Sequence, residues 1–253
     1  MKPVIKIFVA AVLIASAGYA SANPRPTVKS DTFQTVDRHL SGFNSIKIGG
    51  TFEVHITQGP VESVKFEASA DIVDRIVTEV DRGVLKIHNK YDNWGWGFNS
   101  WYSDRSIWHN HKKIVVYVTA KDLGAITVSG SGDVIFSDRI ATNSLKLLVR
   151  GSGSVQGKVE VKRLESHISG SGNIKLSGNA ENSSVRVIGS GKFTGRDLIT
   201  LNSAVHVSGS GNAEINANDK VDASVNGSGD VSYTGAAKIV NSKTSGSGGI
   251  NRF

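Results

Sequence analysis

Residues 166–176 read SHISGSGNIKL, in which two short alternations of polar and apolar residues are joined by the tripeptide Gly-Ser-Gly. This tripeptide occurs seven times, and successive copies begin 21, 19, 19, 20, 18 and 19 residues apart. The copies begin at Gly130, Gly151, Gly170, Gly189, Gly209, Gly227 and Gly246. A period near 20 residues with short strand-like segments is typical of a solenoid in which each repeat forms one coil.

The residues around each Gly-Ser-Gly predict one continuous apolar core. The position two residues before the first glycine holds Val128, Val149, Ile168, Val187, Val207, Val225 and Thr244. The position four residues after it holds Val134, Val155, Ile174, Phe193, Ala213, Val231 and Ile250. Coils stacked about 4.8 Å apart would bury both columns. Because connections between parallel strands favour the right hand, we expect an all-β fold: a right-handed parallel β-helix, or β-solenoid, with coils of about 19–20 residues.

Glycine and serine have separate predicted roles in the repeat. A sharp corner between two strands requires backbone φ values that glycine adopts freely. Each serine hydroxyl can both donate and accept a hydrogen bond, so a stacked column of serines could form a structural ladder. The predicted ladder consists of Ser131, Ser152, Ser171, Ser190, Ser210, Ser228 and Ser247.

The N-terminus predicts export. Lys2 and Lys6 precede an apolar run, residues 7–15, and Ala20-Ser21-Ala22 forms a cleavage site. The run is shorter than the roughly 20 residues that span a bilayer, so we expect a cleaved signal peptide over residues 1–22 and no transmembrane segment afterwards. An uncleaved anchor is the alternative. The expected location is the periplasm, the outer-membrane surface or the extracellular space.

The rest of the chain divides by composition. Residues 23–37, which contain Pro24 and Pro26, predict a flexible leader, and residues 38–253 predict a single β-solenoid domain. Residues 38–128 lack Gly-Ser-Gly but contain strands of similar length, as expected of atypical terminal coils, whereas residues 129–253 contain the Gly-Ser-Gly coils.

An aromatic segment, residues 89–113, interrupts the atypical coils and holds all four tryptophans of the chain. Tryptophan rings stack on sugars or anchor protein interfaces, so the segment predicts a binding surface. The alternative is that the rings pack over the solenoid and protect it. The predicted surface consists of Trp94, Trp96, Trp101, Tyr102 and Trp108.

Composition limits the classes of partner. The chain has no cysteine, so disulfides do not stabilise it in an oxidising compartment. The formal net charge is +7, yet no run of five basic residues occurs. Nucleic-acid sites have clustered cations, so we expect no nucleic-acid partner. Weak attraction to acidic polysaccharide or to anionic membrane surfaces stays open.

Catalytic motifs are not evident. Gly189-Ser190-Gly191-Lys192 lacks the Ser or Thr and the upstream glycine of a phosphate-binding loop. The column after the corner mixes residue types, so we expect no metal and no cofactor; a weak metal site at His109 and His111, or calcium at one coil, is the alternative. Polysaccharide lyases use β-helices, but clustered carboxylates with a basic residue are not visible. We therefore predict that the protein is not an enzyme.

Five segments carry a family resemblance: FNSI (43–46), GGTFEV (49–54), GVLKI (83–87), VVYVT (115–119) and SGSGDV (129–134). In their order and sequence the chain resembles the GIN domain family, whose members are described as auto-transporter adhesin head domains. The resemblance covers about residues 40–245, and it implies a secreted right-handed β-helical domain without catalytic residues.

Together these features predict a non-enzymatic binding or adhesion module of the cell envelope or of the secreted fraction. Its expected partner is an envelope or host glycan or protein. The alternatives are a structural envelope protein that self-associates through the open end of the solenoid, and a glycan-active enzyme.

Overall fold

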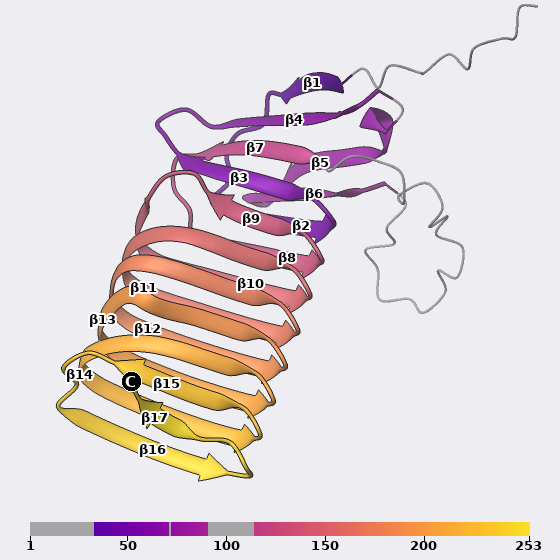
Figure 1. Ribbon diagram of the computed structural model, residues 1–253. Helices are drawn as coiled ribbons and strands as arrows, with labels where there is room; N and C mark the ends of the chain where they lie inside the picture. The colour runs from indigo at the N-terminus through magenta and orange to yellow at the C-terminus, as the bar shows by residue number, and fades with distance from the viewer. Residues whose placement is uncertain (1–32, 71, 91–113) are drawn as a thin grey trace, which may run out of the picture. The chain divides into compact units, whose positions relative to one another are not determined.

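Alternating polar and apolar residues form seventeen strands in the computed structural model, which describes residues 33–70, 72–90 and 114–253 (Figure 1). The first eight are β1 (Phe33–Arg38), β2 (Ser45–Gly50), β3 (Glu53–Gln58), β4 (Ser63–Ser69), β5 (Ile76–Asp81), β6 (Val84–Asn89), β7 (Val115–Ala120) and β8 (Ala125–Gly130). The others are β9 (Asp133–Phe136), β10 (Ile140–Gly151), β11 (Ser154–Gly170), β12 (Asn173–Gly189), β13 (Lys192–Gly209), β14 (Asn212–Gly227), β15 (Asp230–Thr234), β16 (Ile239–Ser245) and β17 (Ile250–Arg252). One 3-10 turn, η1 (Val73–Arg75), precedes β5.

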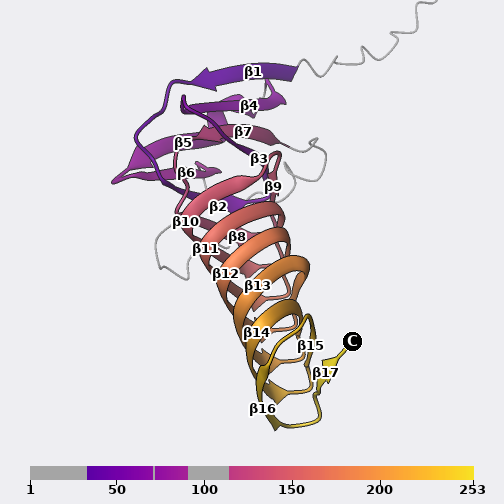
Figure 2. The same cartoon turned by 90° about the vertical axis from the view of Figure 1, so that its left-hand side faces the viewer.

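The Gly-Ser-Gly repeats form stacked parallel coils, which confirms the predicted β-solenoid. Strands β8, β10, β11, β12, β13, β14 and β16 pair in parallel in that order, and Arg150, Ser169 and Ile188 lie beside one another in register. The residues before each corner form one sheet, which we call sheet I, and the residues after it form sheet II. The long strands bend from sheet II through a third side, the flank, into sheet I, as Figure 2 shows.

The predicted inward columns form the core. Val128, Val149, Ile168, Val187 and Val207 each have 0% of their surface exposed, and the column after the corner is equally buried from Val134 to Val231. The last coil differs, because Thr244 is exposed and Ile250 is half-buried. No described coil stacks below β16 and β17, so these two positions have a neighbour on one side only.

Backbone contacts explain the glycines of the corner. Gly170 has φ +116°, and a Cβ built on it would lie 2.6 Å from the carbonyl oxygen of Gly151 in the preceding coil. The Ser171 amide donates a hydrogen bond to that same oxygen at 2.9 Å. All seven central serines are exposed, and no hydrogen bond joins their hydroxyls to one another in the described part of the chain. The corners are therefore joined by backbone bonds, and water can solvate the serine hydroxyls.

One of the atypical coils, formed by β2 and β3, stacks on the repeats out of sequence order. Strand β2 pairs with β8 so that Gly50 lies opposite Gly130, and β3 pairs with β9. Gly50 has φ +109°, the value found at Gly130 and Gly151, and its carbonyl accepts from the Ser131 amide at 3.1 Å. Residues 50–52 thus form an eighth corner without the Gly-Ser-Gly sequence.

The remaining strands close the N-terminal end of the stack. Strand β6 pairs in parallel with β2, and β7 with β3, while β5 and β4 add antiparallel strands to sheet I and sheet II respectively. Strand β1 pairs antiparallel with β4, Thr35 lying opposite Glu67. The predicted flexible leader over residues 23–37 is therefore wrong for residues 33–37, which form most of β1.

The coils differ in length, and the register shifts that accommodate these differences lie outside sheet I. The register shifts between Lys175 and Gly178 where β12 pairs with β13, and again between Thr194 and Asn202 where β13 pairs with β14. From residue 182 to the corner the pairing of β12 with β13 has no shift. Outward residues of sheet I consequently form straight columns along the stack.

Ser166 provides a test of this core. Its side chain is 1% exposed between Leu147 and Val185, and its hydroxyl has no hydrogen-bond partner among the described residues. A buried hydroxyl without a partner opposes folding, so we expect Ser166→Ala to raise the free energy of unfolding by about 1 kcal/mol. Denaturant unfolding measures the change.

Ser203→Ala is the matched control for that experiment. Ser203 is also buried, but its hydroxyl lies 3.3 Å from the Thr200 hydroxyl, which donates to the carbonyl of Asn216. This variant loses a hydrogen bond and should be destabilised by about 1 kcal/mol. If both variants shift stability in the same direction, Ser166 is not an unsatisfied group.

Candidate functional site: the basic face of sheet I

The predicted aromatic surface (Trp94, Trp96, Trp101, Tyr102 and Trp108) lies outside the described residues. Its place in the topology is nevertheless defined by the strands on either side. The segment joins β6 to β7, and these strands pair with β2 and β3, which meet at the corner formed by residues 50–52. The described strands on either side of the segment therefore pair with the two strands of one neighbouring coil.

The described residues show a different feature, a basic face on sheet I. Outward side chains three residues before each corner glycine form one column, because the register places them side by side. In order along the stack this column consists of Lys47, Thr127, Leu148, His167, Arg186, His206, Ser224 and Lys243. Arg150 projects from the neighbouring column, one residue before its corner glycine.

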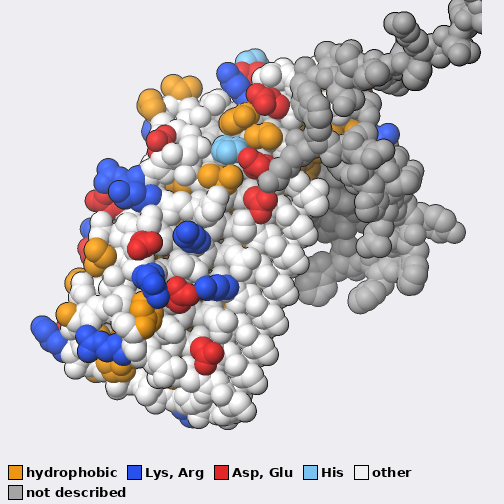
Figure 3. Space-filling model, viewed as in Figure 1, with side chains coloured by type: hydrophobic (Ala, Val, Ile, Leu, Met, Phe, Trp, Pro, Cys, Tyr) orange, Lys and Arg blue, Asp and Glu red, His pale blue; other side chains and the backbone are white. Residues whose placement is uncertain are grey.

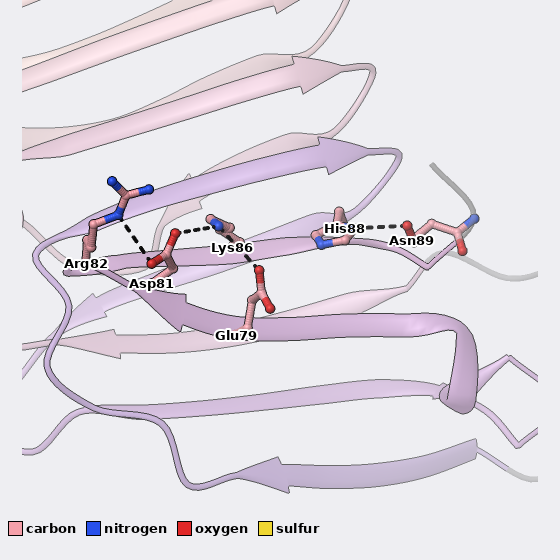
Figure 4. Close-up of polar contacts among 6 residues, drawn as sticks. All are labelled: Glu79, Asp81, Arg82, Lys86, His88 and Asn89. Carbon is pink, nitrogen blue, oxygen red and sulfur yellow. Dashed lines mark hydrogen bonds and ion pairs between the residues drawn. The ribbon is translucent and has the colours of Figure 1, made fainter. Parts of the chain in front are cut away.

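The carboxylates that face outward on sheet I all have cationic partners. At the N-terminal end Lys86 Nζ lies 2.9 Å from Asp81 Oδ2 and 3.4 Å from Glu79 Oε1, as Figure 4 shows. Asp81 also faces Arg82 at 3.4 Å. Hydrogen bonds from Lys86 and Arg82 lower the pKa of Asp81, and the bond to Asp81 raises the pKa of Lys86.

The same holds for the acidic residues further along the stack. Lys146 Nζ lies 2.6 Å from Glu165 Oε1, and Lys220 Nζ lies 2.7 Å from Asp222 Oδ2. Asn241 donates a second hydrogen bond to Asp222 at 2.5 Å. These bonds lower the pKa of Asp222 and hold its charge in place.

Four cations on the same sheet form no ion pair with a described residue: Arg150, Arg163, Arg186 and Lys243. Two neighbouring groups have pKa values that are lowered by burial and, to a smaller extent, by nearby cations. Burial, followed by Arg186 and Arg150, lowers the pKa of His167 and so favours its neutral imidazole. Burial, followed by Lys86 and Arg150, lowers the pKa of Lys47. Sheet I therefore carries positive charge that its own carboxylates do not neutralise.

Two hollows lie on the basic face, and a third lies on the flank. The first, of about 350 Å³, is lined by Arg186, His206, Ser224, Asn241 and Lys243. His206 Nδ1 lies 2.6 Å from the Ser224 hydroxyl inside it. The second, of about 460 Å³, shares residues of β12, β13 and β14 with the first and adds Arg163 and Lys220.

The third hollow lies on the flank and has a volume of about 730 Å³. Its lining combines polar groups such as Asn179 and Glu181 with the side chains of Ile199 and Leu201, which are 49% and 52% exposed. A hollow with amides, carboxylates and isolated apolar side chains can contact a polar polymer through both hydroxyl groups and apolar surfaces.

Sheet II has a mixed charge distribution. Figure 3 shows cationic and anionic side chains next to one another on this face, and Glu214 lies 2.7 Å from Lys192 and 4.0 Å from Arg196. Near the N-terminal end His55 Nε2 lies 2.6 Å from Glu53 Oε1, and its ring stacks on Tyr117 with centroids 5.4 Å apart. Among the described residues no three metal-ligating side chains converge, and none of the helical residues forms a span that could cross a membrane.

Sequence reasoning missed the basic face, because charge was assessed as runs along the chain. The sequence signal for the basic face lies in the position three residues before the first glycine of each Gly-Ser-Gly. Read across repeats, this column contains His167, Arg186, His206 and Lys243, and it contains no acidic residue.

The chain belongs to the family described as "Putative auto-transporter adhesin, head GIN domain", whose model matches residues 42–237. This confirms the resemblance seen in the sequence. No curated protein matches the chain.

Solved structures of similar fold come from Bacteroides and Parabacteroides species. A putative adhesin from Bacteroides fragilis is 23% identical, with a TM-score of 0.76, and the match covers 88% of this chain and 98% of that one. A putative lipid binding protein from Parabacteroides distasonis is 23% identical over the same shares of the two chains, with a TM-score of 0.70. A putative adhesin from the same organism is 22% identical, again covering 88% and 98%, with a TM-score of 0.69.

Proposed function

We propose that this protein is an exported, non-enzymatic binding module of the adhesin-head type, and that sheet I is its main contact surface. The observation that carries the proposal is the charge pattern of that sheet. Every outward carboxylate is paired, whereas Arg150, Arg163, Arg186 and Lys243 are not paired with described residues. Surface cations that the fold does not use are available to a partner.

The rigidity of the scaffold supports a binding role. Strands β10 to β14 are joined by parallel hydrogen bonding, and sheet I keeps its register from coil to coil. Side chains on such a sheet are held at fixed spacing before the ligand arrives. Less conformational entropy is then lost on binding than from a flexible loop.

The aromatic segment is a second proposed contact region. The described strands on either side of it, β6 and β7, pair with β2 and β3. The proposed partner is an envelope or host glycan or protein, and the proposed location is the periplasm, the outer-membrane surface or the outside of the cell. Membership of an adhesin-head family supports the exported role.

Self-association is the second candidate function, and the C-terminal end of the stack favours it. Strand β16 pairs only with β14 among the described strands, and its Ile239 and Val240 are 50% and 40% exposed. An unpaired strand edge can pair with another chain. Against this, the inward positions of β16 include Ser242 and Thr244, which tolerate water at an open end.

A binding assay with a charge-reversal variant tests the proposed function. The purified mature protein is immobilised and exposed to neutral and acidic glycans and to envelope protein fractions. We expect saturable binding of at least one class without shortening of the glycan, and a loss of about tenfold in affinity for Arg186→Glu. Lys175→Glu on sheet II is the matched control, because Lys175 is exposed and also forms no ion pair with a described residue.

Three results would contradict the proposal: no saturable binding, progressive depolymerisation of a glycan, or equal losses in the two variants. Light scattering on the same preparation tests the second candidate. A dimer that dissociates when Val240→Lys is introduced would favour self-association through β16.

A further inference from the structure

We propose that the ligand of sheet I is a linear acidic polysaccharide, which lies along the stack with its anionic groups against Arg150, Arg186 and Lys243. This inference rests on the proposed function, and it names the class of ligand. It requires a sheet that offers repeated cations, hydroxyl-binding groups between them and a concave path.

The cations repeat along the solenoid axis. The register places Arg186, His206, Ser224 and Lys243 in one column of successive coils. Neighbouring coils are about 4.8 Å apart, so Arg186 and Lys243 are separated by about 14 Å along the axis. Arg150 lies two coils from Arg186 in the other direction, at about 10 Å along the axis. A row of cations at such intervals complements a polymer with regularly spaced negative groups.

The local electrostatics agree with an anionic ligand. His167 lies between Arg186 and Arg150 on sheet I, and its pKa is lowered first by burial and then by these two arginines. The groups that face His167 from neighbouring positions are Lys146, Arg150, Glu165 and Arg186, and Glu165 is paired with Lys146. An anion placed here relieves the repulsion among the cations.

The groups between the cations favour a sugar polymer over other polyanions. Ser184, Ser224 and Asn241 line the 350 Å³ hollow with Arg186 and Lys243, and they supply donors and acceptors for sugar hydroxyls. A nucleic acid needs a dense cluster of phosphate contacts, and typical sites make about 6–10 of them. Four dispersed cations do not provide that number.

The shape of the surface distinguishes a polymer chain from a bilayer. The 350 Å³ and 460 Å³ hollows share Ser184, Ala204 and Asp222, so they form a continuous depression across β12, β13 and β14. A chain can lie in a depression of this kind, whereas a flat bilayer surface contacts only its rim. Ile188 is a large apolar side chain that is exposed on the described surface, and it lies on sheet I near the basic column.

Polygalacturonate is the probe for the test, with neutral dextran as the uncharged polymer. We expect the full mature protein to bind polygalacturonate and not dextran, with affinity falling as salt is raised from about 0.05 to 0.5 M because exposed charges are screened. The double variant Arg186→Gln/Lys243→Gln should bind about tenfold more weakly, since two exposed ion contacts are lost.

Lys158→Gln/Lys175→Gln is the matched control, because it removes the same charge from a sheet II hollow of about 390 Å³. It should retain the affinity of the parent protein within about twofold. Equal weakening in both double variants would overturn the inference, because binding would then follow net charge alone. Circular dichroism melting curves confirm that each variant is folded before its affinity is compared.

Vesicles containing phosphatidylglycerol test whether the ligand of sheet I is an anionic membrane surface and not a polysaccharide. Binding to these vesicles without binding to polygalacturonate would overturn the inference in favour of a membrane surface. Saturable binding to dextran or to an envelope protein, sensitive to Arg186→Glu but not to salt, would also overturn it. The proposed binding function would stand in that case, so the two failures are distinguishable.

Discussion

Val187→Asp should lower the free energy of unfolding by about 4 kcal/mol, because it places a carboxyl group in the closed core of the solenoid. Val187 is 0% exposed, and it lies in register between Ile168 and Val207, which are also fully buried. None of these neighbours can donate a hydrogen bond from its side chain to the carboxylate. A domain with a typical stability of about 5–15 kcal/mol would lose a large share of it. Chemical denaturation and thermal melting both measure this loss.

Arg186→Asp is the matched control for this experiment, since it introduces the same side chain one position away. Arg186 is exposed on sheet I and forms no ion pair with a described residue, so its replacement should change stability by less than about 0.5 kcal/mol. Equal melting temperatures for the two variants would contradict the alternation in which Val187 faces the core and Arg186 faces the solvent. The control also separates stability from binding, because Arg186→Asp should weaken ligand binding while leaving the protein folded.

Because of the repeat, the core residues and lateral neighbours of most of the solenoid could be predicted from the sequence. An offset of 19 residues placed Ile168 beside Val187 before the register was known, and the same offset places Lys146 opposite Glu165. Core residues and one cross-coil ion pair therefore follow from the period alone. This works because parallel in-register coils convert a sequence offset directly into a lateral neighbour.

The N-terminal coils could not be read in the same way. Four strands separate β3 from β8 in sequence, yet β2 and β3 stack directly on β8 and β9. The corner at residues 50–52 has only one glycine in common with Gly-Ser-Gly, at Gly50. Strand β1 was also missed, because its partner β4 pairs antiparallel and no repeat relates the two. Long-range pairing without a repeat leaves little local signal.

The basic face was hidden for a related reason. Its unpaired cations, Arg150, Arg163, Arg186 and Lys243, are 13, 23 and 57 residues apart along the chain, so they never form a run, and only the coil register gathers them. Whether a given cation is free depends on its neighbours in space. Lys220 is paired with Asp222 two residues away in β14, whereas Arg186 has no carboxylate within pairing distance among the described residues.

Gly170→Ala should destabilise the protein by about 3 kcal/mol, because the corner requires glycine for two separate reasons. Gly170 has φ +116°, a backbone conformation that residues with a Cβ rarely adopt. The added methyl group would also lie 2.6 Å from the carbonyl oxygen of Gly151, which already accepts the Ser171 amide. The coil would have to separate from its neighbour at the corner, and thermal melting of the variant would show the loss.

Two further variants divide that effect into its causes. Ser171→Ala leaves the backbone unchanged at an exposed position, so its stability should stay within about 0.5 kcal/mol of the parent. Gly172→Ala tests close approach without positive φ, because its Cβ would lie 2.5 Å from Val149 Cγ1 and 2.6 Å from the Gly153 oxygen. If Gly170→Ala were as stable as Ser171→Ala, the corner would not need glycine at its first position. The sevenfold recurrence of Gly-Ser-Gly would then require an explanation in ligand binding, because backbone geometry would no longer account for it.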